Sequence, residues 1–433
     1  MNLLTYIQNL AVRGIHAFSG KLFHRQPVFP LADRLLADLL RLAEIPSPSP
    51  QEEERAAFIL ERLHLLGTTP WVDEDGNVCV RLHSAASAGE APLLLFADLG
   101  SRRWHPLGSL SRLDAVHAWG AGLADVLGVA ALLYVAEAVS QGRLKSGRDI
   151  LLLFAARSFE DPESRVFALI TENPLNHPFA AVGFRGFTLG SMVTHARGIY
   201  RMALSVETLG NEKDAEEEEA PKKKESGPEN PNLVVDTLTA AAARLSGAWA
   251  SNEKIRLYIR SIKALSGYGR TPSEGILEFE LESGPPPEDP SQRREPESVS
   301  VPSGTLLEEA MAGARASAEA AIRHPELKGA VTITAFIPAG DPGLTAGLSR
   351  LLGNIMRDLR IKVREEDGPD PSAFLSNRGI PAVSLGIAQG REGLSLDTIE
   401  IASIEKGRQL IDKVIEALTS GVELAEAPVK EQR

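Results

Sequence analysis

Acidic side chains follow two apolar runs and one glycine-rich loop, at positions where they could bind a metal ion. Asp98 ends the run PLLLFAD, Asp125 lies in GAGLADVLG, and Glu160 follows DILLLFAARSF. Such runs predict buried parallel strands, whose carboxyl ends lie at one edge of a sheet, where α/β proteins place their chemistry. Carboxylate oxygens suit hard ions better than Zn²⁺, which prefers nitrogen and sulfur. We therefore expect no cofactor, or at most one divalent ion (Zn²⁺, Mg²⁺ or Ca²⁺) held weakly by these three acids.

Two of these acids also have a purely structural explanation. Asp125 suits the first turn of a helix, where a carboxylate interacts favourably with the helix dipole. Glu160 and the adjacent Asp161 are better explained as exposed acids of a loop. The metal site is therefore one hypothesis, and a structural role for each acid is the other.

The composition limits the kinds of partner. The chain has 433 residues, of which 43% are hydrophobic, enough for two or more domains. A formal net charge of −12 and the absence of a basic stripe argue against nucleic acid as a partner. Cys79 is the only cysteine, which excludes an internal disulfide and a cysteine metal cluster. A single cysteine suits a reducing compartment, so we expect a cytoplasmic protein.

Residues 1–30 mix apolar and basic side chains. They contain no apolar run of the roughly 20 residues needed to span a bilayer, and no small-residue cleavage site after an apolar core. We interpret this segment as an amphipathic extension of the mature protein that packs as an extra helix. The alternative is a membrane-peripheral protein, with this helix on a membrane surface.

The rest of the chain shows two patterns of elements. Residues 31–197 and 339–426 alternate helices with buried strands, which predicts an α/β domain with a mainly parallel sheet flanked by helices. Residues 198–338 follow the order strand, helix, strand, strand, helix, strand, which predicts an inserted ferredoxin-like α+β domain. Inside this insertion, residues 211–231 and 284–298 are charged or proline-rich and are expected to be flexible loops.

An α/β domain interrupted by a ferredoxin-like insertion resembles the dinuclear zinc peptidases and deacylases of the acetylornithine deacetylase, succinyl-diaminopimelate desuccinylase, carboxypeptidase and peptidase T family. The likeness covers nearly the whole chain after Pro30. It is close in GAGLADVLGVAALL, where Asp125 occupies the position of the acid that bridges the two metals. The resemblance implies that the insertion is a lid and dimerisation domain, that the protein is a homodimer, and that its ligand is a small peptide or an N-acyl amino acid.

The chain departs from the family at most of the positions that carry the chemistry. Asp98 stands where the family has its first histidine ligand, and Gly100 stands where it has the acid that orients that ligand. Phe159 replaces the glutamate that acts as general base, and a phenyl ring cannot accept a proton from a metal-bound water. Gly393 replaces the last histidine ligand, and Asp397 occupies the nearby glutamate position.

A further family ligand, an acid at the start of the insertion, has no counterpart near Arg185 and Gly186. With so many positions replaced together, we expect no catalytic residue to be retained. The leading hypothesis is a degenerate family member, a pseudoenzyme that acts as a binding or assembly scaffold. The alternative is an active metal-dependent amidohydrolase or peptidase with a rebuilt site.

Overall fold

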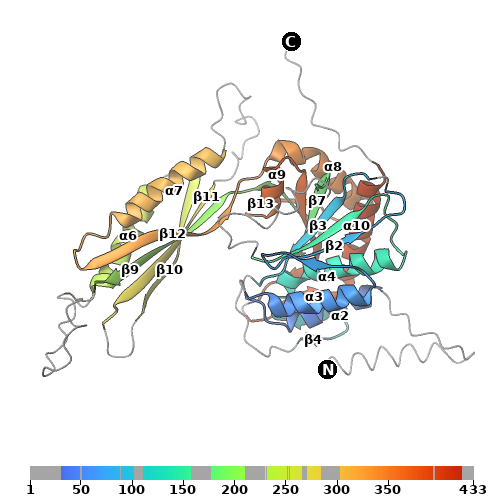
Figure 1. Ribbon diagram of the computed structural model, residues 1–433, viewed down its shortest axis with the longest axis horizontal. Helices are drawn as coiled ribbons and strands as arrows, with labels where there is room; N and C mark the ends of the chain where they lie inside the picture. The colour runs from blue at the N-terminus through green and yellow to red at the C-terminus, as the bar shows by residue number, and fades with distance from the viewer. Residues whose placement is uncertain are drawn as a thin grey trace, which may run out of the picture. The chain divides into compact units, whose positions relative to one another are not determined.

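The computed structural model describes residues 31–48, 51–87, 89–101, 111–157, 177–209, 230, 232–250, 252, 254–265, 271–283, 303–393 and 395–421. The chain divides into two compact units (Figure 1). The large unit contains the described residues up to Ala196 and those from Gly340 onward, and the inserted unit contains those within Arg197–Ala339. The predicted extension, residues 1–30, and the loop predicted over 284–298 lie outside the described residues, as does the loop over 211–231 apart from Asn230.

Eight strands of the described residues form the main sheet of the large unit, in the order β1-β2-β6-β3-β7-β14-β8-β13. Their bounds are β1 Trp71–Val72, β2 Val78–Leu82, β3 Leu93–Asp98, β6 Ile150–Ala155, β7 Ala180–Phe187, β8 Ser191–Ala196, β13 Arg364–Gly368 and β14 Ala382–Ala388. The central strands β6, β3, β7 and β14 are parallel, while β2 and β8 pair with them antiparallel. The predicted mainly parallel sheet is confirmed.

Helices of the large unit pack on this sheet or on one another. They are α2 Leu31–Ala43, α3 Glu53–Leu65, α4 Leu123–Ser140, α8 Pro342–Asp358, α9 Ser372–Ser376 and α10 Ile401–Thr419. Helix α4 contacts β3 and β7, α8 contacts β8, and α10 contacts β14. By length and composition α4 could cross a membrane, alone among the helices of the described residues, but 83% of it is buried inside the protein. Its apolar surface is explained by its place between the sheet and α2.

Helix α4 approaches the sheet closely because it carries a glycine where it crosses β7. A Cβ atom at Gly128 would lie 2.1 Å from the carbonyl oxygen of Phe184 and 2.9 Å from the Cβ of Ala97. These distances leave no room for any side chain at this position. The contact therefore fixes the start of α4, which carries Asp125, against the end of β7, which carries Arg185.

A second, smaller sheet lies in the large unit, in the order β15-β16-β5-β4. Its strands are β4 Arg112–Leu113, β5 His117–Gly120, β15 Gly390–Arg391 and β16 Asp397–Glu400, all antiparallel to their neighbours. Asp397 pairs with Gly120 in the register of β16 and β5. This pairing brings Asp397 to the loop that leads into α4, although the two are far apart in the sequence.

The inserted unit has the predicted ferredoxin-like order. Its elements are β9 Ile199–Thr208, α6 Leu233–Trp249, β10 Ile255–Leu265, β11 Glu274–Ser283, α7 Ser303–Glu319 and β12 Leu327–Ile337. The sheet order is β10-β11-β9-β12 and every pairing is antiparallel. One side of this sheet packs with α6 and α7 into a separate hydrophobic core. The predicted α/β fold with an inserted α+β domain is therefore confirmed.

Candidate functional site

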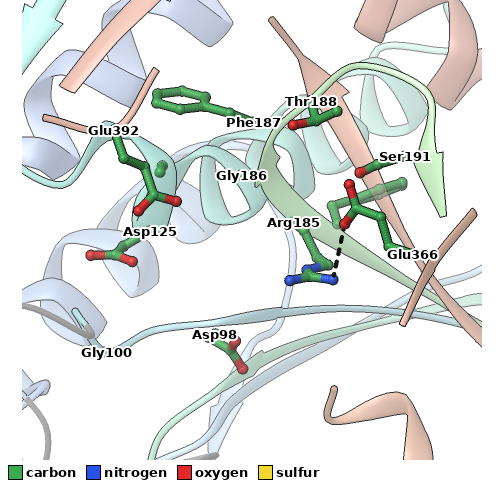
Figure 2. A pocket seen from close by; sticks show the side chains of 12 residues that line it. Asp98, Gly100, Asp125, Arg185, Gly186, Phe187, Thr188, Ser191, Glu366 and Glu392 are labelled. Atoms are coloured by element: carbon green, nitrogen blue, oxygen red, sulfur yellow. Dashed lines mark ion pairs between the residues drawn. The ribbon is translucent and has the colours of Figure 1, made fainter. Parts of the chain in front are cut away.

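A pocket of about 180 Å³ lies where β3 and β7 end and α4 begins (Figure 2). Its lining contains four acidic side chains, one arginine and several glycine and apolar residues. The charged members are Asp98, Asp125, Arg185, Glu366 and Glu392. The carboxyl ends of parallel strands and the start of a helix meet here, which is where α/β folds bind ligands.

Two of the predicted metal-binding acids lie at this pocket, together with Gly100. Asp98 is the last residue of β3, and Asp125 lies in the first turn of α4. The position of Asp125 satisfies both explanations made from the sequence, because a first-turn acid also faces the pocket. The other predicted positions, Phe159 and Glu160, lie outside the described residues. Their roles stay predictions.

Asp397 has a clear structural contact at the edge of this site. Its two carboxylate oxygens accept hydrogen bonds from the backbone N–H groups of Ala124 and Gly393, each at 3.1 Å. Helix α4 begins after Gly122, which offers no side-chain cap, so the distant Asp397 satisfies one of its first N–H groups. Burial raises the pKa of Asp397, and the nearby Asp125 and Glu392 raise it further, against the lowering effect of the two hydrogen bonds.

Two glycines at this site leave no room for a side chain. A Cβ at Gly393 would lie 2.1 Å from the carbonyl oxygen of Leu396, and a Cβ at Gly186 would lie 2.5 Å from that of Ala124. A histidine at position 393, where the resemblance implies one, would therefore require the backbone to move, as would any side chain at position 186. The packing, and not only the residue type, thus leaves no space for a histidine at position 393.

Arg185 is a pocket residue whose role the sequence did not reveal. It lies near the carboxyl end of β7, and Figure 2 shows its side chain directed into the space near Asp98 and Glu366. Its Nη1 lies 3.6 Å from Oδ2 of Asp370 and 3.9 Å from Oε2 of Glu366. These distances exceed a direct hydrogen bond, so both contacts are electrostatic. The available signal was a single charge at the end of the apolar run AAVGFRGF.

A second arginine, Arg55 of α3, lies buried beside the end of β3. It donates hydrogen bonds to the carbonyl oxygens of Leu99 and, at 2.9 Å, of Ile45, and to Oγ of Ser101 at 3.1 Å. Burial lowers the pKa of Arg55 to about 10, and the attraction of Asp125 acts in the opposite direction. Arg55 is therefore charged at neutral pH, within the electrostatic influence of the pocket acid Asp125.

The residues of the described chain do not fit a dinuclear metal centre. No group of three His, Cys, Asp or Glu side chains within the described ranges lies close enough to hold an ion. Both oxygens of Asp397 already accept backbone hydrogen bonds, and Gly393 has no space for a side chain. A cation of the protein, Arg185, lines the same pocket. The described side chains thus support charge pairing within the protein better than metal coordination.

Comparison with solved structures identifies the fold. Over 90% of its length the chain is similar to a tripeptidase from Staphylococcus aureus, with a TM-score of 0.59, 15% identity and 98% of that chain covered. A di-peptidase from Saccharomyces cerevisiae matches 91% of the chain and 97% of its own, with a TM-score of 0.60 and 13% identity. A dinuclear metal binding peptidase of the M20 family from Bacillus subtilis is similar over 90% of this chain and 99% of its own chain, with a TM-score of 0.54 and 13% identity.

Sequence comparison gives a shorter match. No protein-family model matches the chain. A segment of 103 residues is 36% identical to a putative LysW-lysine/LysW-ornithine hydrolase from Pyrococcus abyssi, and this segment covers 24% of the chain and 28% of that relative. The fold of the chain is therefore the fold of the M20 peptidases, and the resemblance predicted from the sequence is confirmed at this level.

Proposed function

We propose that this chain is a degenerate M20 peptidase that does not catalyse metal-dependent hydrolysis and that binds a small ligand in the pocket of the large unit. The observation that carries the proposal is the pairing of Arg185 with Asp370 and Glu366 at the pocket. A fixed guanidinium repels the divalent ions on which the family chemistry depends. Gly393 supports the same conclusion, because it leaves no room for the histidine that the resemblance implies there.

The proposed ligand is a small peptide or an N-acyl amino acid. Such a molecule carries a carboxylate, and a guanidinium is the side chain best suited to pair with it. The Arg185 side chain is 27% exposed, which leaves part of it accessible from solvent. The S. aureus and S. cerevisiae neighbours are a tripeptidase and a di-peptidase, and they support this choice of ligand class.

Metal analysis and a hydrolysis screen test the loss of activity. We expect purified protein to contain no stoichiometric zinc, magnesium or calcium, and to release no product from di- and tripeptides or N-acyl amino acids with Zn²⁺, Mn²⁺ or Co²⁺ added. Stoichiometric zinc together with turnover that disappears in an Asp125→Asn variant would refute the proposal and establish the rebuilt hydrolase instead.

Thermal shift with the same compounds tests ligand binding. A ligand that binds the folded state raises the melting temperature as its concentration rises. We expect a rise with at least one compound in the wild type, and none with that compound in Arg185→Met. Arg143→Met, at an exposed position after α4, is the control and should respond as the wild type does.

We also propose that the protein is a cytoplasmic homodimer that associates through the inserted unit. The proposal follows from the resemblance to lid-dimerised peptidases. Light scattering on the full chain should give twice the mass of one 46.6 kDa chain, and deletion of residues 198–338 should give a monomer. A monomeric full chain would refute it.

A further inference from the structure

The pocket places several negative charges together. Asp98, Asp125, Glu366 and Glu392 all line it, within a volume of about 180 Å³ (Figure 2). Carboxylates that share a small site destabilise one another's charged forms unless a cation lies among them. In a dinuclear metal binding peptidase, metal ions provide such positive charge.

We propose that the guanidinium of Arg185 is the resident cation of this pocket, that it takes the place which metal ions have in metal-binding relatives, and that it keeps divalent ions out. The inference rests on the proposed loss of metal-dependent hydrolysis and gives it a physical cause. Arginine suits this role because its charge is permanent at any physiological pH. The chain itself therefore supplies positive charge to the pocket, independent of metal supply.

Asp370 is the positioning residue for Arg185. It lies just before α9 and its side chain is 1% exposed. Oδ1 of Asp370 accepts hydrogen bonds from Oγ of Ser384 at 2.6 Å and from the backbone N–H of Ser372 at 2.9 Å. Its buried Oδ2 accepts no hydrogen bond from the described part of the chain and lies 3.6 Å from Nη1 of Arg185. A buried carboxylate requires a nearby cation, so Asp370 holds the guanidinium at the pocket.

Arg55 supplies a second fixed positive charge from below the end of β3. Its hydrogen bonds to the Leu99 carbonyl and to Ser101 hold it beside the strand end that carries Asp98, and it interacts electrostatically with Asp125. Arg55 is 2% exposed, so water does not screen this charge effectively. The charge of the pocket acids is thus partly offset by two guanidinium groups that belong to different elements, β7 and α3.

Binding of Mn²⁺ tests the inference directly, because this ion accepts carboxylate ligands and is followed by electron paramagnetic resonance and by calorimetry. The proteins to compare are the wild type, Arg185→Lys, the double variant Arg185→Met with Asp370→Asn, and the surface control Arg143→Met. The double variant removes both members of the buried pair, so that no uncompensated charge is left inside the fold. Circular dichroism confirms that each variant is folded.

We expect the wild type, Arg185→Lys and Arg143→Met to bind no Mn²⁺ below about 1 mM. The double variant should bind Mn²⁺ at least ~10-fold more tightly, because a positive charge a few ångströms from the ion has been removed. In the wild type, binding should stay absent from about pH 6 to about pH 9, since arginine does not lose its proton there.

Three other results would overturn the inference. A wild type that binds no Mn²⁺, together with a folded double variant that binds no better, would overturn the role of Arg185 and leave the proposed function standing. Mn²⁺ binding by the wild type that appears as the pH rises would also overturn it, even if the double variant does not fold. Stoichiometric metal with turnover in the wild type would overturn both the inference and the proposed function.

Discussion

Replacing Gly128 by alanine should destabilise the large unit and disturb the pocket together. The added Cβ would lie 2.1 Å from the Phe184 carbonyl oxygen, whereas ordinary contacts begin near 3.4 Å. Helix α4 must therefore move away from β7 by roughly 1 Å or more, in a core packed without free space. Asp125 lies one turn earlier on α4, and Arg185 directly follows Phe184, so this displacement changes their separation.

The expected magnitude is the difference of two effects. Overpacking a well-packed contact costs about 3 kcal/mol, and the higher helix propensity of alanine returns about 1 kcal/mol. The net loss for Gly128→Ala is therefore about 2 kcal/mol. Gly353→Ala in α8 is the matched control, because its Cβ would meet only Nη2 of Arg357 at 3.7 Å, an ordinary contact. We expect the control to be more stable than the wild type by about 1 kcal/mol.

Urea denaturation followed by circular dichroism measures the stability of both variants, whose substitutions lie in the same unit of the protein. The midpoint should fall for Gly128→Ala and rise slightly for Gly353→Ala, with unchanged slopes. If Gly128→Ala were as stable as the wild type while the control gained stability, the argument that close packing fixes α4 against β7 would be refuted.

Three further predictions concern Asp397, Gly393 and Cys79. Asp397→Ala should cost about 2 kcal/mol, because two backbone N–H groups lose their acceptor. The pKa of Asp397 in the folded protein is raised above its ordinary 3.8, so this carboxyl stabilises the wild type most below pH 3.8. The stability difference between the wild type and the variant should therefore shrink as the pH rises through the folded-state pKa. Urea midpoints measured across this pH range test the expectation. Gly393→His, which restores a family ligand by residue type, should lower the thermal midpoint and bring no metal binding, because its Cβ meets the Leu396 carbonyl; stable metal binding would contradict this. Cys79 is fully buried and burial raises the pKa of its thiol, so it should react with a disulfide reagent in urea but not in the native protein.

The architecture could be predicted because it depends on local patterns. The apolar residues of LLLFAD and ILLLFA are all buried in the central parallel strands, as continuous apolar runs indicate. The inserted unit alternates buried and exposed residues along strands such as β12, which reveals a sheet with one covered face. Both patterns are set by which side chains must leave water.

The site was only partly predictable. Asp98 and Asp125 could be placed at one sheet edge, because strand ends and helix starts meet there in any fold of this class. The contact of Asp397 with the start of α4 could not be predicted, since it spans 273 positions and depends on the pairing of β16 with β5. The role of Arg185 was missed because its partner Asp370 is also distant in the sequence and belongs to a different element.

The sequence by itself determined the fold class, the inserted domain and the residue types at positions such as 98 and 393, because periodicity and residue identity are local properties. Only the tertiary structure decided which residues come together. It showed that Gly393, between β15 and β16, has no space for a side chain and that Arg185 and Arg55 stand beside the pocket acids. Charges and carbonyl groups from distant segments act on one another through a few ångströms of space, and that distance is set by packing alone.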